Sequence, residues 1–183
     1  FISQEECEAY IDYIDRNIEK ITFYESAKRH HLMFGHEVEH KDKSLTSLDI
    51  VYEIKDRLIS LFGKVEAIAK SVTGSKSDVF VSSFFIAKQI KGSFIDRHFD
   101  TDENTNLHLK HSVVLYLNTM SDSSGGTLNF PYLNYSYSPK GGDLIIFPSN
   151  EKEYSHEVLD IKENRYSIPL FLTDDPDFKL IRN

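Results

Sequence analysis

Residues 79–90 have the sequence VFVSSFFIAKQI, a run of β-branched and aromatic residues with the length of a strand. Similar runs follow at residues 112–117, 127–130, 143–147, 156–159 and 165–172. Turn signals separate these runs, among them the adjacent glycines Gly125 and Gly126 and a Pro-Lys-Gly-Gly segment. Many short strands joined by tight turns predict a β-sandwich or a jelly roll.

The first part of the chain has the periodicity of helices. Ser3 and Glu6 have the spacing of a capping box, and apolar residues recur behind them at helical intervals, so we predict a helix over about residues 4–20. A second apolar stripe, within residues 48–68, predicts a helix that ends near Gly74.

Composition indicates one globular domain. With 183 residues, of which 40% are hydrophobic, the chain can bury a single core, so we expect one domain over residues 1–183. Helices followed by strands predict an α+β fold. Its supporting helices would occupy about residues 1–75 and its jelly-roll core about residues 78–173.

Charge and cysteine content narrow the classes of partner and compartment. A formal net charge of −8 argues against a nucleic-acid-binding protein, and no apolar run is long enough to span a membrane. Cys7 is the only cysteine, which excludes an internal disulfide and favours the cytoplasm. The chain begins at Phe1 rather than Met, which is compatible with removal of a leader or an upstream domain. The sequence predicts no oligomeric state.

A metal-binding pattern lies at His98-Phe99-Asp100. In an extended segment, residues two apart point the same way, so the imidazole and the carboxylate can converge on one ion. A third ligand must come from elsewhere, and His156 begins another predicted strand. Two imidazoles and one carboxylate form the facial triad that leaves open positions on Fe(II). We therefore predict that His98, Asp100 and His156 bind iron.

The segments around this triplet resemble the prolyl 4-hydroxylase group of 2-oxoglutarate/Fe(II) oxygenases. The resemblance covers about residues 80–173 and rests on an ordered set of motifs. These are Gly92 through His98-Phe99-Asp100, Val114-Leu115-Tyr116-Leu117-Asn118, Gly125-Gly126-Thr127-Leu128-Asn129-Phe130, Pro139-Lys140-Gly141-Gly142-Asp143 with Phe147-Pro148, His156-Glu157-Val158 and Arg165-Tyr166-Ser167. The resemblance implies a double-stranded β-helix, which is a distorted jelly roll. It also implies Fe(II), 2-oxoglutarate as co-substrate, O2, and ascorbate as a reductant.

The resemblance further implies which residues bind 2-oxoglutarate. Arg165 is expected to pair with the distal carboxylate, because a guanidinium offers two coplanar donors. Ser167 lies two residues further along the strand, so it can add a hydrogen bond from the same face. Tyr116 matches a position whose phenol reaches the same carboxylate, although a tyrosine there also fits a sandwich core. Gln89 stands where members of the group often carry a tyrosine, which leaves the contacts at this position open.

The activity implied by the resemblance is hydroxylation of a C–H bond with release of succinate and CO2. The substrate would be a prolyl residue of a peptide or protein, or a free amino acid or similar small molecule. A non-catalytic jelly-roll binding module is an alternative, and the complete set of metal ligands argues against it.

A rival metal-binding pattern, His36-Glu37-Val38-Glu39-His40, lies in the polar, histidine-rich segment 25–43. On a helix, His36 and His40 would share a face with Glu37 available as general base, as in a zinc metallohydrolase. No apolar stripe would anchor such a helix, so we predict that residues 25–43 form a mobile loop. His108 and His111 lie close to the first triplet, and we interpret both as non-ligands.

Overall fold

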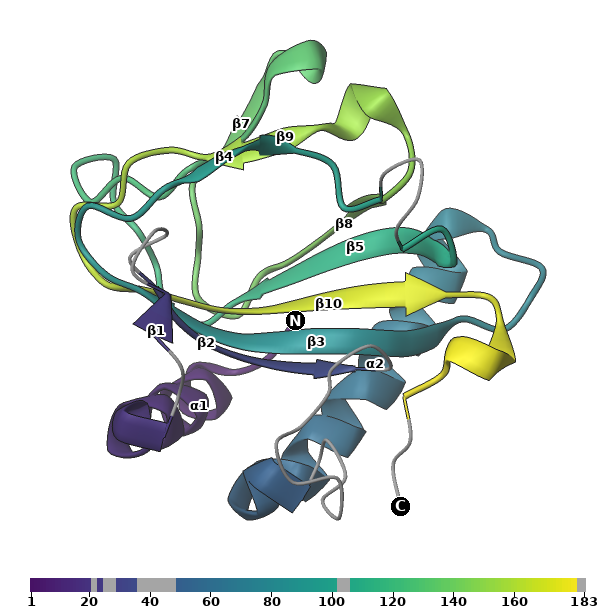
Figure 1. Ribbon diagram of the computed structural model, residues 1–183, viewed down its shortest axis with the longest axis horizontal. Coiled ribbons are helices and arrows are strands. Elements are labelled where there is room, and N and C mark those ends of the chain that lie inside the picture. Colours follow the sequence, from purple (N-terminus) through teal and green to yellow (C-terminus); the bar gives the residue numbers. More distant parts are fainter. Residues whose placement is uncertain (21–22, 25–28, 36–48, 102–105, 181–183) are drawn as a thin grey trace.

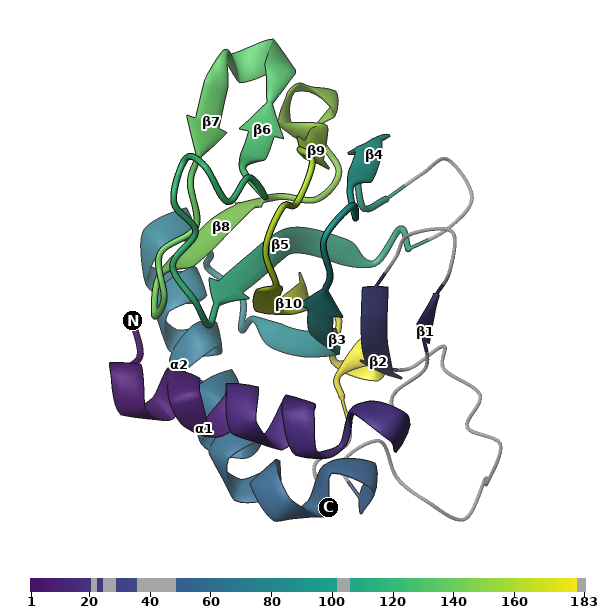
Figure 2. The same ribbon diagram turned by 90° about the vertical axis from the view of Figure 1, so that its left-hand side faces the viewer.

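A computed structural model describes residues 1–20, 23–24, 29–35, 49–101 and 106–180. Figure 1 shows three layers: a pair of helices, a larger antiparallel sheet, and a smaller antiparallel sheet that faces the larger one. Figure 2 shows the same arrangement from the side, with the helices on one face of the larger sheet and the smaller sheet over the other. The predicted α+β jelly roll is confirmed.

The larger sheet has the strand order β1-β2-β3-β10-β5-β8, and the smaller sheet has the order β4-β9-β6-β7. The strands of the larger sheet are β1 (Phe23–Tyr24), β2 (Arg29–Gly35), β3 (Phe80–Gln89), β5 (Leu109–Tyr116), β8 (Leu144–Pro148) and β10 (Arg165–Thr173). Those of the smaller sheet are β4 (Ile95–His98), β6 (Leu128–Phe130), β7 (Tyr135–Tyr137) and β9 (His156–Val158). Short 3-10 helices lie between strands or after them: η4 (Pro131–Leu133), η5 (Lys152–Tyr154) and η6 (Pro176–Phe178).

Helix α1 (Gln4–Arg16) begins with the predicted capping box. The backbone N–H of Glu6 donates to Ser3 Oγ at 3.1 Å, and the backbone N–H of Ser3 donates to the Glu6 carboxylate at 2.9 Å. These bonds satisfy two amide groups at the start of the helix, which otherwise have no partner within it. The 3-10 helix η1 (Ile18–Lys20) follows, so the helical segment ends close to the predicted boundary.

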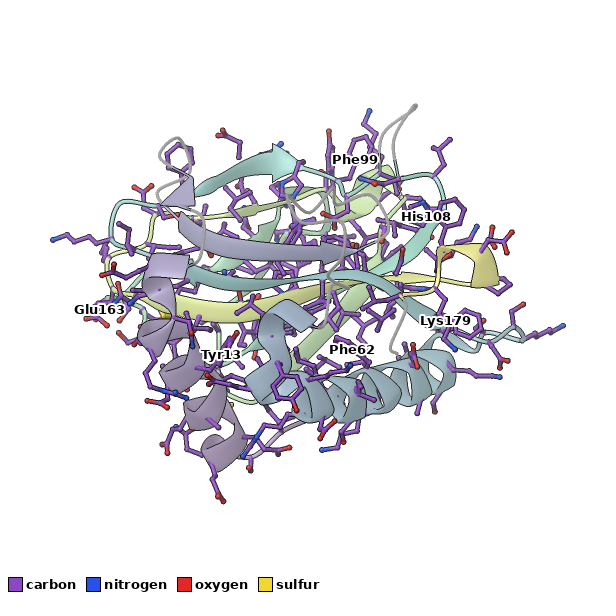
Figure 3. The ribbon with its side chains drawn as sticks, turned by 60° about the horizontal axis from the view of Figure 1, so that its bottom comes forward. Tyr13, Phe62, Phe99, His108, Glu163 and Lys179 are labelled. Carbon is purple, nitrogen blue, oxygen red and sulfur yellow. The ribbon has the colours of Figure 1, made fainter. Side chains whose placement is uncertain are left out.

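Helix α2 (Lys55–Thr73) follows the 3-10 helix η3 (Asp49–Ile54). Its apolar stripe faces the larger sheet: Phe62 is fully buried, and its ring centroid lies 4.9 Å from that of Phe84. Figure 3 views this helical layer from outside and labels Phe62. Gly74 ends the helix with a φ of 65°, a left-handed conformation that favours glycine. None of the helices that the structure describes is long and apolar enough to cross a membrane.

Two cores hold the layers together. The core between the helices and the larger sheet includes Phe62 and Leu115, and the core between the two sheets includes Val114, Tyr116 and Val158. Consecutive side chains of β5 therefore alternate between the two cores, as expected for a strand that is buried on both faces.

The predicted turn at Gly125 and Gly126 brings the chain close to the residues before β10. Both glycines have positive φ, and a Cβ at Gly125 would clash with the backbone oxygen of Asp160. A Cβ at Gly126 would lie 3.1 Å from Cδ of Arg165. Glycine is therefore required for the turn at the first position, and at the second it leaves space beside the arginine.

Part of the segment predicted as a mobile loop is a strand instead. Residues Arg29–Gly35 form β2, which pairs with β3 along its whole length. The side-chain pattern did not predict this strand, because the strand forms by backbone pairing on the free edge of β3. Such pairing does not require a particular sequence. The strand β7 was also not predicted, since three residues carry too little periodicity. The rival pattern at residues 36–40 lies outside the described residues.

Candidate metal centre

Three side chains that can bind a metal converge at the ends of β4 and β9. His98 ends β4 and His156 begins β9, and the two residues are direct partners in the smaller sheet. Asp100 follows β4 by two residues. One candidate ligand atom from each residue lies within 4.8 Å of the others. Over the described ranges, no other three His, Cys, Asp or Glu side chains come together in this way.

Backbone carbonyls orient both imidazole rings. His98 Nδ1 lies 2.8 Å from the oxygen of Asp96, and His156 Nδ1 lies 3.1 Å from the oxygen of Tyr154. Because a carbonyl can only accept, each Nδ1 carries the proton and each Nε2 of a neutral ring keeps its lone pair. These Nε2 atoms face Asp100: His98 Nε2 lies 3.5 Å from Oδ1 of Asp100, and His156 Nε2 lies 3.9 Å from Oδ2.

The protonation states at this centre suit a metal ligand set. Burial lowers the pKa of the His156 imidazole, although the charge of Asp100 opposes this effect. Burial acts to raise the pKa of the Asp100 carboxyl, but His98, His156 and the Ser112 hydroxyl outweigh it and hold that pKa below its usual value. A neutral imidazole and an ionised carboxylate are the forms that bind metals.

The candidate ligands line a cavity of about 520 Å³ between the two sheets. Two sets of lining residues differ in character. The polar end, which we define as Gln89, Arg165 and Ser167, lies where β3 pairs with the start of β10. The aromatic wall, which we define as Phe85 and Phe171, has ring centroids 5.3 Å apart in an edge-on arrangement.

Arg165 is buried at the polar end, with 3% of its surface exposed. Its Nη1 donates to Gln89 Oε1 and lies 3.4 Å from Ser167 Oγ. The guanidinium carbon lies 5.0 Å from the ring centroid of Tyr116. The contacts that the structure describes for this buried cation are therefore with neutral groups, an arrangement that favours the binding of an anion.

Two hydrogen-bond donors at the polar end, one on Arg165 itself and one on Tyr116, also lack an acceptor in the described part of the chain. Counting only the described residues, neither Arg165 Nε nor the Tyr116 hydroxyl has a hydrogen-bond partner. Burial raises the pKa of the Tyr116 phenol, and the opposing charge of Arg165 does not reverse this, so the hydroxyl keeps its proton. An unpaired buried donor typically costs about 1–3 kcal/mol. A carboxylate bound here could accept from both groups.

The structure brings five of the six predicted site residues to one cavity. Those that line it are His98, Asp100, His156, Arg165 and Ser167. Tyr116 lies against Arg165, and the lining that the structure describes does not include it. Ser112, which contacts Asp100, is a site residue that the sequence did not predict, and the role of Gln89 was left open. The alternation along β5 could have identified Ser112, because it lies on the face of Tyr116.

The two nearby histidines lie apart from the metal centre. His108 Nε2 is 3.1 Å from Ser82 Oγ, and its ring stacks on Phe178 with centroids 4.0 Å apart. Figure 3 shows His108 beside the C-terminal segment. His111 precedes Ser112 on β5, so its side chain leaves the other face of the sheet. In the part of the chain that is described, neither belongs to a metal-binding group.

Residues 84–173 match the model of the 2OG-Fe(II) oxygenase superfamily. A search among curated proteins gave no match.

Solved structures with a similar fold include several prolyl hydroxylases. One is the viral collagen prolyl hydroxylase from Paramecium bursaria Chlorella virus-1 in its 2OG complex, with 18% identity, a TM-score of 0.64, and coverage of 94% of this chain and 90% of that chain. A prolyl-4-hydroxylase from Pseudomonas putida has 21% identity, a TM-score of 0.62, and coverage of 94% and 88%.

A third similar structure is a prolyl hydroxylase from Trichoplax adhaerens in complex with a peptide fragment of the hypoxia inducible factor oxygen degradation domain. It has 18% identity, a TM-score of 0.59, and coverage of 95% of this chain and 80% of that chain. At such identities these likenesses show a common fold. The match of residues 84–173 shows that the jelly-roll part of the chain resembles the 2OG-Fe(II) oxygenase superfamily, and this likeness implies Fe(II), 2-oxoglutarate and O2.

Proposed function

We propose that this protein is a hydroxylase in which His98, Asp100 and His156 bind Fe(II) and Arg165 binds the distal carboxylate of 2-oxoglutarate. One observation carries the proposal: the three candidate ligands and the buried arginine line the same cavity. A metal and a dicarboxylate co-substrate would then share one enclosed space between the sheets.

The donor set fits Fe(II). Two neutral imidazoles and one carboxylate form a facial set of ligands that leaves positions open for a chelating co-substrate and for O2. The ring of His156 is also held by aromatic neighbours, since its centroid lies 4.8 Å from that of Phe147 and 5.7 Å from that of Phe130. These rings fix the imidazole and keep water away from its faces.

The polar end fits a carboxylate. Arg165 has neutral partners in Gln89 and Ser167, so its charge is available to a ligand. Nε of Arg165 and the hydroxyl of Tyr116, which have no hydrogen-bond partner among the described residues, supply two more donors. Arg165 and Tyr116 would hold the carboxylate that does not reach the metal, and Ser167 would support the guanidinium from the same strand.

When bound, Fe(II) and 2-oxoglutarate supply the oxidation: O2 is consumed, 2-oxoglutarate is converted to succinate and CO2, and one oxygen atom enters a C–H bond of the substrate. The protein positions these reactants and excludes water. His98, Asp100 and His156 fix one end of the co-substrate site, and Arg165 fixes the other.

The substrate we propose is a prolyl residue of a peptide or protein, with a free amino acid as the next candidate. The aromatic wall of Phe85 and Phe171 offers an apolar surface to a saturated ring. Phe94 lines the cavity and is 45% exposed, so the cavity opens to the surface and a longer chain could continue outside. The similar structure from Trichoplax adhaerens contains a bound peptide, which agrees with this geometry.

The test is 2-oxoglutarate turnover by the Fe(II)-reconstituted protein. We expect succinate release to rise when prolyl peptides are added, with hydroxyproline formed in equal amount, and to rise less with free amino acids. His156→Ala should abolish both products. Before O2 is admitted, 2-oxoglutarate should give the visible charge-transfer band of a chelated 2-oxo acid. Absence of the band with iron shown to be bound, together with no succinate release, would contradict the proposal.

A further inference from the structure

Asp100 differs from the two histidines in how it is held. His98 and His156 lie in strands and are oriented by carbonyls of their own neighbouring residues. Asp100 lies beyond the end of β4, and its carboxylate contacts Ser112, which belongs to β5 of the larger sheet. The position of this carboxylate therefore depends on a contact between the two sheets.

The Ser112 hydroxyl donates a hydrogen bond to Asp100 Oδ2. Ser112 Oγ also lies 2.8 Å from Ser149 Oγ. A hydroxyl has one proton, and Ser112 uses it on Asp100, so Ser149 must be the donor in the second contact. The result is a directed chain of hydroxyl groups from Ser149 through Ser112 to Asp100, in which each bond polarises the next.

This chain of hydroxyl groups is buried, and its backbone is held by hydrogen bonds. Ser112 is 2% exposed and Ser149 is 1% exposed. The backbone of Ser149 is fixed on both sides, because its N–H donates to the oxygen of Lys110 at 3.0 Å and its oxygen accepts from Thr101 Oγ1 at 3.0 Å. Thr101 directly follows Asp100, so the same contact also anchors the backbone beside the carboxylate.

The two oxygens of Asp100 are thereby made unequal. Oδ1 lies 3.5 Å from His98 Nε2 and Oδ2 lies 3.9 Å from His156 Nε2, but only Oδ2 also accepts the hydrogen bond from Ser112. A carboxylate oxygen that already accepts a strong hydrogen bond donates less to a metal, so Oδ1 is the better ligand atom.

We propose that Ser112, supported by Ser149, is a positioning residue that presents Oδ1 of Asp100 to the metal. This inference rests on the proposed function, because it takes Asp100 as a ligand. Loss of an outer partner of this kind typically weakens metal binding by about 10–100-fold. Ser149 acts only through Ser112, so its removal should have the smaller effect.

The test is titration of the metal-free protein with Co(II), followed by the d–d absorption of the bound ion and by competition with a chelator. Ser112→Ala should weaken Co(II) binding by about 10–100-fold and change the absorption spectrum. Ser112→Thr keeps the hydroxyl and should recover most of the affinity and the original spectrum. Ser149→Ala should weaken binding less than Ser112→Ala.

Ser82→Ala is the matched control. Ser82 is also a buried serine of the larger sheet, with 1% of its surface exposed, but its hydroxyl contacts His108. Its loss should leave Co(II) binding and the spectrum unchanged. Thermal unfolding of each metal-free variant shows whether the fold is intact.

The outcomes separate this inference from the proposed function. If Ser112→Ala binds Co(II) with the affinity and spectrum of the parent while His156→Ala loses binding, Asp100 needs no positioning by Ser112 and the inference fails alone. The same holds if Ser112→Thr, correctly folded, is as impaired as Ser112→Ala. If His156→Ala also binds Co(II) normally, the metal lies elsewhere and the proposed function fails.

Discussion

The metal centre and the polar end of the cavity are built in different ways. At the metal centre the His98 side chain is 39% exposed, and Asp100 lies outside any strand. At the polar end Gln89 and Arg165 are partners in adjacent strands and are 1% and 3% exposed. One end is assembled from strand ends of the smaller sheet, and the other is part of the larger sheet. Metal binding and co-substrate binding should therefore respond to different substitutions.

The largest expected effect is on metal binding. His156→Ala removes one of three candidate ligands, so Fe(II) affinity should fall by more than the roughly 10–100-fold that the loss of an outer partner costs. Isothermal titration of the metal-free protein with Fe(II) under anaerobic conditions measures it. His111→Ala is the matched control, because His111 leaves the opposite face of β5, and it should bind Fe(II) normally. Equal losses in both variants would mean that the loss in His156→Ala does not come from the removal of a metal ligand.

The next effect should fall on 2-oxoglutarate alone. Arg165→Ala removes the buried cation, and losing one partner of a desolvated charge pair costs about 2–5 kcal/mol, which is roughly thirtyfold to several thousandfold in affinity. Fe(II) binding should be nearly unchanged. Titration of 2-oxoglutarate into the anaerobic Fe(II) protein, followed by the charge-transfer band, measures the co-substrate affinity, and titration of the metal-free variant with Fe(II) measures the metal affinity.

Arg165→Lys sharpens this comparison. An ammonium keeps the charge but not the two coplanar donors, so affinity should be recovered only in part. If Arg165→Ala bound 2-oxoglutarate as tightly as the parent, the anchor would have to lie elsewhere in the cavity.

The contrast between the two ends also explains what the sequence could reveal. The strands β3 and β10 have runs of β-branched and aromatic residues, so their existence, and their boundaries to within one residue, followed from pattern alone. The candidate ligands His98 and Asp100 followed from a local triplet, and the candidate ligand His156 followed from its place at the start of a predicted strand. Roles at the polar end came from the family resemblance, not from periodicity.

Contacts between segments remote in sequence were not predictable. The pairing of Gln89 with Arg165 depends on the register of β3 against β10, and the contact of Ser112 with Asp100 depends on how the two sheets face each other. Neither the strand pairing nor the side-chain contact can be predicted from a local sequence pattern. The strand β2 was missed for the same reason, because it forms by pairing on the edge of β3.

A smaller effect is expected at Gln89. Gln89→Leu removes the acceptor that holds Nη1 of Arg165, and a hydrogen bond to a charged group contributes about 1.5 kcal/mol or more, so 2-oxoglutarate affinity should fall roughly tenfold. Fe(II) affinity should not change. The same anaerobic titration applies.

Gln89→Glu tests whether the partner of Arg165 must be neutral or needs only to fill the space. Glutamate keeps the shape and the acceptor, so a packing role alone predicts little change. If Gln89 leaves the charge of Arg165 free for a ligand, a carboxylate at this position neutralises it and weakens 2-oxoglutarate binding further than leucine does. An affinity equal to that of the parent in Gln89→Glu would show that the neutral partner of Arg165 has no importance.

The smallest effect is expected for Tyr116→Phe. This substitution should affect the stability of the ligand-free protein and the affinity for 2-oxoglutarate in opposite directions. The Tyr116 hydroxyl is buried, and within the described structure it has no partner, so its removal should leave the ligand-free protein as stable as before or more stable. If the hydroxyl donates to bound 2-oxoglutarate, the same change should weaken co-substrate binding by about 1 kcal/mol, or roughly fivefold. Thermal unfolding with and without 2-oxoglutarate measures both quantities.

Tyr137→Phe is the control, because the Tyr137 hydroxyl donates to Asp143. Its loss should lower stability and leave 2-oxoglutarate affinity unchanged. A Tyr116→Phe protein that is destabilised yet binds 2-oxoglutarate normally would show that Tyr116 is a core residue and that the anchor is Arg165 with its neighbours on β3 and β10.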